Sequence, residues 1–172
     1  MNNKNVGKMT RNALGIALYV TVSMLLQVRF IGNYFFHLGY VVMMVYLVNF
    51  GTLSGFFVGV IGVLLYCLLA ASPNGLITWP VANALIAFVC GNVFKKTNEM
   101  KEPLRSVIDI ASILLATALG FLVSKPLLET LLFAQDFWVR ATVSFSAFVM
   151  DAIVLVISYP IARRLVRLLN RR

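Results

Sequence analysis

Long apolar segments dominate this chain and restrict the folds that it can adopt. Residues 54–71 carry no charged side chain, and comparable segments recur along the sequence. Hydrophobic residues make up 60% of the 172 residues and charged residues 12%, about half of the charged fraction of soluble domains. A soluble core of this size cannot bury so much apolar surface. We therefore predict an all-α integral membrane protein with a single membrane domain over residues 1–172.

Six of the apolar segments are candidates for membrane-spanning helices, which need about 20 apolar residues each. We place them at residues 9–28, 36–50, 54–71, 79–95, 106–125 and 139–162. The second is short, and the tight turn FGTLSG separates it from the third. No convincing cleavage site follows the first, so we expect a retained span rather than a signal peptide. The predicted fold is a bundle of six transmembrane helices.

The basic residues are distributed unevenly about these segments. Twelve of the 15 lysines and arginines precede the first span, lie between the fourth and fifth, or follow the sixth. The positive-inside rule places this face, and with it both termini, in the cytoplasm. Topology thus accounts for the formal net charge of +9, and we expect no nucleic-acid partner.

The sequence contains no arrangement that is typical of an enzyme. It has one histidine, no GxxxxGK[ST] nucleotide-binding loop, no HExxH motif and no cluster of cysteines and histidines. No serine–histidine or paired-carboxylate arrangement is indicated either. We therefore expect a protein that is not an enzyme and that holds no cofactor and no metal.

Asp151 lies near the middle of the sixth predicted span, where an ionisable side chain is energetically costly. Such a residue marks either a functional site or a structural contact between helices, and both interpretations stay open. If the fourth and sixth spans pack together, Asn83, Thr142 and Ser144 share its environment. Asp151 is therefore a candidate binding residue.

Further polar and aromatic candidates lie near the predicted outer ends of the spans. Lys125 is followed by Glu129 at helical spacing. The two form either an exposed ion pair of little energetic value or a site for an anionic or carbonyl-bearing solute. His37, Tyr34 and Trp79 are either ligand contacts or interfacial residues, because aromatic side chains gather at membrane interfaces without any ligand.

Small residues recur at four-residue intervals in two segments. Gly51, Gly55 and Gly59 lie in or beside the third span, and Ala13 and Ala17 lie in the first. Such spacing lets helix backbones approach closely in lipid. We expect the glycines to serve helix packing.

Together, these features resemble a known family. A basic N-terminus leads to the AxxxA pattern, a polar outer loop, the segment HLGYVVMMVYLVNFGTLSGFFVGVIGVLLYCLLA and then NALIAFVCGNVF. This order is similar to the substrate-binding S component of an energy-coupling factor (ECF) vitamin transporter of the riboflavin type. The resemblance covers residues 9–95 by motif and the remainder by topology and length. It implies a multi-pass protein of a prokaryotic plasma membrane that binds a water-soluble vitamin or precursor beneath its outer loops.

The resemblance also implies protein partners. These are a transmembrane coupling subunit and two cytoplasmic ATPases, which agrees with the missing nucleotide motif. In the family, small residues of the first span contact the coupling subunit. Carried over, that contact is made by Ala13 and Ala17, with Gly15 adding little bulk nearby. The alternative is that this strip packs inside the bundle.

The chain departs from the family pattern at three places. Tyr40 stands where many relatives have an acidic residue, Thr52 replaces a common proline, and LYCLLA lacks a common aspartate. Riboflavin therefore does not transfer as the substrate. The candidate substrate-binding residues are Asn33, Tyr34, His37, Tyr40, Trp79, Asn83, Lys125 and Asp151.

This combination suits a planar heterocycle with hydrogen-bonding substituents. We predict a pyridine or pyrimidine compound, such as a vitamin B6 form or a thiamine precursor. The alternatives are a membrane scaffold without a small-molecule ligand and a stand-alone secondary carrier.

Overall fold

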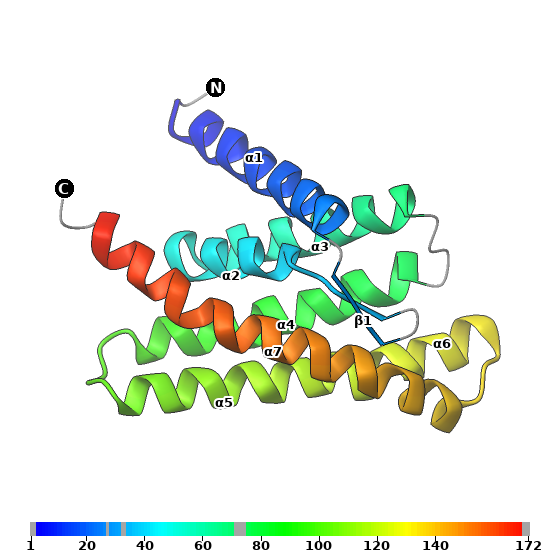
Figure 1. Cartoon of the computed structure of the whole chain (residues 1–172). Helices are drawn as coiled ribbons and strands as arrows, with labels where there is room; N and C mark the ends of the chain where they lie inside the picture. The colour runs from blue at the N-terminus through cyan, green and yellow to red at the C-terminus, as the bar shows by residue number, and fades with distance from the viewer. Residues whose placement is uncertain (1–2, 27, 32–33, 71–74, 170–172) are drawn as a thin grey trace.

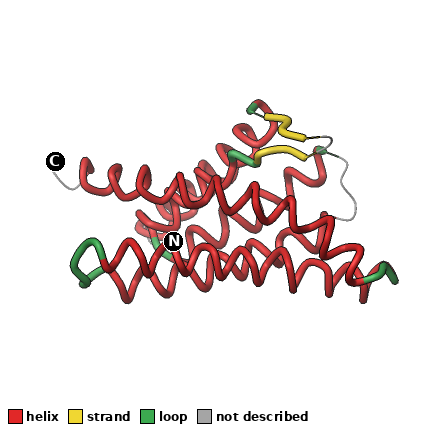
Figure 2. Tube along the Cα trace, turned by 60° about the horizontal axis from the view of Figure 1, so that its bottom comes forward, coloured by secondary structure: helices red, strands yellow, loops and turns green. Residues whose placement is uncertain are grey.

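The computed structural model describes residues 3–26, 28–31, 34–70 and 75–169. Helices make up nearly all of this part of the chain, and two short strands lie at one end (Figure 2). In chain order the elements are α1 (Asn3–Leu25), β1 (Val28–Ile31), β2 (Tyr34–Phe36), α2 (Gly39–Phe50), α3 (Thr52–Leu69), α4 (Gly75–Thr97), α5 (Leu104–Ala118), the π-helical segment η1 (Leu119–Ser124), α6 (Lys125–Phe133) and α7 (Phe137–Leu169). The predicted helical bundle is confirmed, but the antiparallel β1–β2 hairpin corrects the all-α prediction for the first outer loop.

Within the part of the chain that the structure describes, four helical segments are long and apolar enough to cross a membrane. They are Thr52–Leu69, Gly75–Thr97, Leu104–Phe133 and Phe137–Leu168. α2 is apolar but has only 12 residues, and α1 carries Lys8 and Arg11 in its first half. The chain is thus a multi-pass membrane protein, while the count of six spans and the cytoplasmic termini stay predictions.

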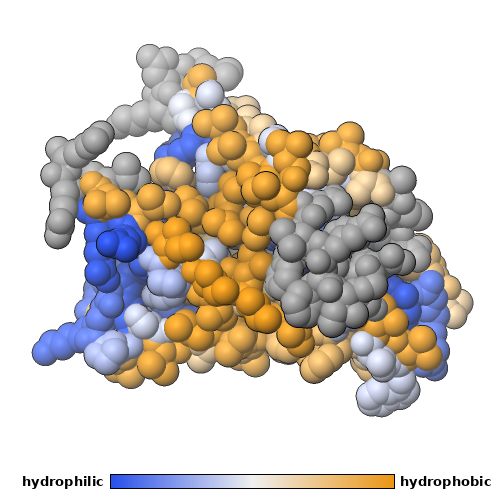
Figure 3. Space-filling model, in the orientation of Figure 1, coloured by the Kyte–Doolittle hydropathy of each residue, from blue (hydrophilic) through white to orange (hydrophobic). Residues whose placement is uncertain are grey.

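The bundle has two distinct ends. The hairpin and α6 lie at one end, and the α4–α5 turn, the start of α1 and the end of α7 lie at the other (Figure 1). We call these the outer and inner ends, after the predicted orientation. Hydrophobic residues cover the middle of the molecule, and hydrophilic residues gather toward both ends (Figure 3). This distribution is the one that a bilayer requires.

α3 shows how the sequence orients a helix in lipid. Large apolar side chains repeat along its exposed face, at Leu53, Phe57, Ile61 and Leu65. The opposite face carries glycines and points into the bundle. In a soluble protein the large apolar side chains would face the core. Here they face outward, because lipid, unlike water, imposes no penalty on exposed apolar surface.

The glycine face of α3 confirms the predicted role in helix packing. A Cβ atom on Gly55 would lie 2.9 Å from the Cα of Leu47, which belongs to the backbone of α2. A Cβ on Gly59 would lie 2.5 Å from the sulfur of Met43. Only a glycine therefore allows α2 to approach α3 this closely.

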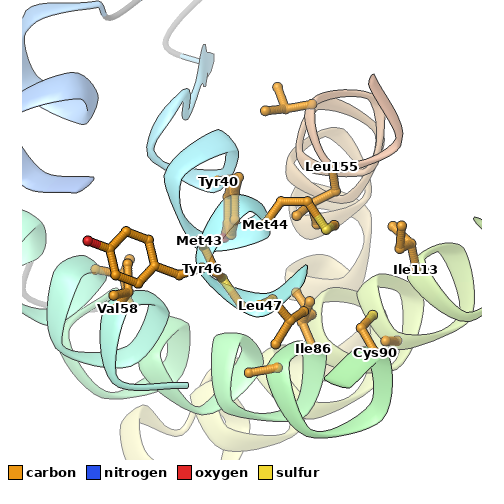
Figure 4. Close-up of a cluster of buried hydrophobic side chains, with 14 of the residues drawn as sticks. Tyr40, Met43, Met44, Tyr46, Leu47, Val58, Ile86, Cys90, Ile113 and Leu155 are labelled. Atoms are coloured by element: carbon orange, nitrogen blue, oxygen red, sulfur yellow. The ribbon is translucent and has the colours of Figure 1, made fainter. Parts of the chain in front are cut away.

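The short helix α2 lies at the centre of the core. It packs against α1, α3, α4 and α7. Met43, Met44 and Leu47 are almost completely buried. Figure 4 shows them surrounded by side chains from the neighbouring helices, among them Val58, Ile86, Ile113 and Leu155. Its 12 residues are thus packed against four helices, and the exposed Phe50 lies at its end.

The fifth predicted span ends too early at residue 125. α5, η1 and α6 follow one another without a break from Leu104 to Phe133. Pro126 has no amide hydrogen to donate and would normally interrupt a helix. The π-helical turn just before it changes the pairing, since the Lys125 N–H bonds the Gly120 carbonyl. The chain consequently continues as a helix, and the expected outer loop shrinks to residues 134–136.

Two further boundaries also differ from the prediction. The first helix covers Asn3–Leu25 rather than residues 9–28, and the last covers Phe137–Leu169 rather than 139–162. Hydropathy marks the part of a helix that lies in lipid. Basic residues such as Arg163 and Arg167 continue the same helix beyond it.

A buried ionic cluster around Asp109 holds the inner end together. Thr97 Oγ1 donates to its carboxylate at 2.5 Å, the Tyr159 hydroxyl donates to the other oxygen, and Arg163 Nη2 lies 3.0 Å away. Arg105 lies 3.9 Å from the same carboxylate. Because these residues come from α4, α5 and α7, the cluster connects three helices. The sequence analysis did not identify Asp109, since its partners lie far apart in the chain.

Candidate functional site

Asn83 is the centre of a buried polar network in the core of the bundle. The Tyr40 hydroxyl donates to Asn83 Oδ1 at 2.9 Å, and Asn83 Nδ2 donates to the Gly59 carbonyl at 2.9 Å. Nδ2 also lies 3.5 Å from the Tyr19 hydroxyl. The four residues belong to α2, α4, α3 and α1. Asn83 therefore connects four helices, and much of its hydrogen-bonding capacity is used inside the protein.

Asp151 lies in α7, and its side chain is buried with 1% of the residue exposed. Neither carboxylate oxygen has a hydrogen-bond partner among the described residues. The Tyr40 hydroxyl, whose proton is donated to Asn83, lies within hydrogen-bonding reach of this carboxyl, and the charge of Lys125 acts on it from farther away. A buried ionisable group without a direct hydrogen bond is energetically costly. Its presence in the core therefore indicates a functional or a structural role.

Lys125 belongs to a second buried polar group, which connects α6 with α7. Its ammonium nitrogen lies 3.9 Å from Glu129 Oε1, and Arg140 Nε lies 2.6 Å from Glu129 Oε2. Glu129 is 1% exposed, and Thr78 Oγ1 approaches it at 3.4 Å. The alternative of an exposed Lys125–Glu129 ion pair is therefore wrong. Glu129 has two cationic neighbours, Lys125 and Arg140, so its single negative charge does not fully neutralise Lys125.

Aromatic rings cover the space next to Lys125. The Lys125 ammonium lies 5.5 Å from the centre of the Trp79 ring, and the His37 ring packs edge-on against Trp79 at 4.7 Å and against Tyr66 at 5.2 Å. Trp79 Nε1 is buried without a hydrogen-bond partner among the described residues. Burial lowers the pKa of His37 to about 4, and the nearby Lys125 charge contributes. His37 is thus neutral at physiological pH and can both donate and accept a hydrogen bond.

The structure brings six of the eight predicted binding residues into one connected group. They are His37, Tyr40, Trp79, Asn83, Lys125 and Asp151. Asn33 lies outside the described residues, and Tyr34 is described only as part of the backbone of β2. Of the predicted neighbours of Asp151, Ser144 is buried on α7 and its hydroxyl has no described partner, whereas Thr142 is exposed.

Four residues of this region were not predicted as binding residues from the sequence. Tyr19, Tyr66 and Arg140 were not identified, and Glu129 was considered only with Lys125. Tyr19 and Tyr66 look like ordinary aromatic residues of an apolar helix in the sequence. Arg140 reaches Glu129 only because α6 and α7 turn back on each other. No local sequence pattern predicts such a contact.

The small residues of α1 lie on two different faces. Ala13 and Ala17 are exposed on the outside of the bundle. Gly15 is buried, and a Cβ on it would lie 2.5 Å from the Tyr46 ring and 2.7 Å from Val58. The predicted partner contact of Gly15 is therefore replaced by packing against α2 and α3. Ala13 and Ala17 remain available to a partner.

Comparisons with known proteins place the chain in a family. A family model described as the S component of an ECF-type riboflavin transporter matches residues 3–167. Two proteins of Streptococcus thermophilus, from different strains and each named a UPF0397 protein, are 29% identical over 163 residues, which is 91% of this chain and 88% of each relative. No solved structure matches at a significant level.

Proposed function

Because the chain belongs to the S component family of ECF-type riboflavin transporters, which are transporter components and not catalysts, we propose that it is the high-affinity substrate-binding subunit of an ECF-type importer. The importer would take up a water-soluble vitamin or precursor across the plasma membrane of a prokaryote. The streptococcal source of the two relatives supports that location.

The observation that carries the substrate-binding role is the buried carboxyl of Asp151, which lies near Tyr40 and Lys125 but makes no hydrogen bond of ordinary geometry among the described residues. Two further buried groups without a described hydrogen-bond partner, Trp79 Nε1 on α4 and Ser144 Oγ on α7, belong to the same two helices as Asn83 and Asp151. Leaving such groups unpaired costs about 1–3 kcal/mol each, and more for a charge. A bound solute that donates to Asp151 recovers this cost. These groups therefore support a polar ligand at this site.

The same groups favour a heterocycle with a basic or amino substituent. Asp151 accepts from an amine or a protonated ring nitrogen, while Trp79 and His37 offer aromatic surface and hydrogen bonds. A pyridine or pyrimidine compound, such as a vitamin B6 form or a thiamine precursor, has these features. Lys125 would face a hydroxyl, carbonyl or anionic substituent of the same molecule.

The proposed protein partners are a transmembrane coupling subunit and two cytoplasmic ATPases. The exposed Ala13 and Ala17 of α1 support this part of the proposal, since small side chains let a partner helix approach closely. Ala17→Trp should abolish copurification with the coupling subunit and leave ligand binding unchanged. Leu115→Trp, on an exposed position of α5, is the matched control. Equal copurification of the two variants would contradict the proposed contact.

The decisive experiment is to purify the whole chain from cells grown in rich medium and to identify the released small molecules by mass spectrometry. A heterocycle in stoichiometric amount is the expected result. An empty protein would be followed by a binding screen across vitamins and their precursors. A blank screen would refute the proposal in favour of a membrane scaffold. Uptake into vesicles that lack any ATPase would refute it in favour of a secondary carrier.

A further inference from the structure

A basic cavity opens between α5 and α7 at the inner end of the bundle. Its volume is about 400 Å³. Its lining includes the side chains of Arg163, Arg164 and Arg167 from α7 and of Glu102 and Ser106 from the start of α5 and the turn before it. The proposed substrate site lies in the other half of the molecule, so this cavity has no part in that function.

The charges in this cavity are not balanced. Arg163 pairs with the buried Asp109 at 3.0 Å, and Arg167 pairs with Glu102 at 2.6 Å. Arg164 has no ion pair or hydrogen bond among the described residues. One cation at the mouth of the cavity is therefore free to bind an anion.

An apolar groove continues from this cavity along the same two helices. It is lined entirely by apolar side chains, among them Ile110 and Leu114 of α5 and Val149, Ile153 and Val156 of α7. Its volume is about 440 Å³. The groove and the cavity lie along the same face of each helix. Their lining residues recur at intervals of three or four, for example Ser106, Ile110 and Leu114 on α5.

The length of the groove matches one leaflet of a membrane. On α7 the groove lining runs from Phe148 to Ile157, and the helical rise of 1.5 Å per residue gives roughly 14 Å between them. Half of the hydrocarbon core of a bilayer measures about 15 Å. With the basic cavity at the level of the inner-leaflet headgroups, a groove of this length would reach close to the bilayer midplane.

We propose that the seam between α5 and α7 is a binding site for an anionic phospholipid of the inner leaflet. Arg164 contacts the headgroup phosphate, and the groove holds one acyl chain. A protein occupant is disfavoured because the strip available to a partner lies on α1, which packs on α2 and α3 and not on this seam. The combination of a free cation and an apolar groove one leaflet long fits a lipid.

The test uses the whole chain in nanodiscs of equal parts phosphatidylglycerol and phosphatidylcholine, followed by native mass spectrometry of the retained lipid. The parent protein should retain phosphatidylglycerol in preference. Arg164→Gln should lower that preference about fivefold, since one cation near an anionic headgroup contributes about 1 kcal/mol. Ile153→Phe fills the groove at a position that is 43% exposed and should reduce the retention of both lipids.

Two control variants separate a site from a generally basic surface. Lys96→Gln removes the same charge from an exposed position of α4, and Ile161→Phe adds the same ring to an exposed position of α7 outside the groove. Both should behave as the parent protein. Equal retention of the two lipids by the parent protein would overturn the proposal, as would equal effects of Lys96→Gln and Arg164→Gln. The proposal would also be overturned if Arg164→Gln or Ile153→Phe weakened assembly with a protein partner while lipid retention stayed unchanged.

Discussion

The substitution Asp151→Asn tests the substrate site most directly, because it removes one charge and hardly changes the shape of the side chain. The carboxylate is 1% exposed and has no described hydrogen-bond partner. If it binds the substrate, the variant loses one hydrogen bond to a charged group, which contributes about 1.5–3 kcal/mol. The dissociation constant should then rise roughly 10- to 150-fold.

The stability of the empty protein should change in the opposite direction. A buried carboxyl either carries a charge away from water, which costs several kcal/mol, or must take up a proton, and the neutral amide avoids both costs. The thermal midpoint of empty Asp151→Asn should therefore equal or exceed that of the parent protein. A purely structural aspartate predicts the reverse, a lower midpoint, because its partners in other helices would be lost.

Isothermal titration calorimetry with the identified substrate measures the affinity, and thermal unfolding in detergent measures the stability. Asp136→Asn is the matched control, since Asp136 is exposed at the outer end and an asparagine can still accept the hydrogen bond from the Val139 amide. Unchanged affinity of Asp151→Asn would refute the proposed role. A loss of affinity that merely follows a loss of stability would refute it as well.

Three further predictions concern packing, the inner ionic cluster and pH. Gly55→Ala should lower the free energy of unfolding by about 1–3 kcal/mol, because its Cβ meets the backbone of α2; Gly7→Ala, with nothing within 4 Å, should not lower it in the same thermal unfolding assay. Asp109→Ala should cost about 3–5 kcal/mol by leaving buried cations unpaired, against at most about 1 kcal/mol for the exposed Glu102→Gln. The His37 contribution to stability should be present above pH 6.5 and fall by up to about 2 kcal/mol by pH 5, because the unfolded state then takes up a proton that the partly buried His37 of the folded state, with its lowered pKa, does not. His37→Gln should abolish that part of the pH dependence, and an unchanged slope would contradict the lowered pKa.

The sequence predicted the membrane environment and the positions of most helices because hydropathy acts locally. A run of apolar residues such as 54–71 must lie in lipid or in a core whatever the rest of the chain does. The glycine spacing in α3 also acted locally, since it requires a neighbouring helix to approach. Boundaries failed where other forces act: the π-helical turn before Pro126 lets the helix continue past residue 125, where the fifth predicted span ends.

The candidate site was predicted only in part. Residue type and depth in the membrane identified Asp151, Lys125 and Asn83, because polar groups are rare there. Their partners could not be read from the sequence. Asn83 bonds Tyr40 and Gly59 on two other helices, and these contacts depend on how each helix is rotated about its axis.

By itself, then, the sequence determined that this protein lies in a membrane, that it is mainly helical and that it resembles a family of transporter components. Tertiary structure decided which polar groups are paired and which are left for a ligand. Glu129 and Arg140 meet through the α6–α7 reversal, Gly15 points inward while Ala17 points outward, and Asp151 is left without a direct partner. The physical reason is that partition into a bilayer depends on summed local hydropathy, whereas a hydrogen bond between helices depends on distances of a few tenths of an ångström that only the packed bundle defines.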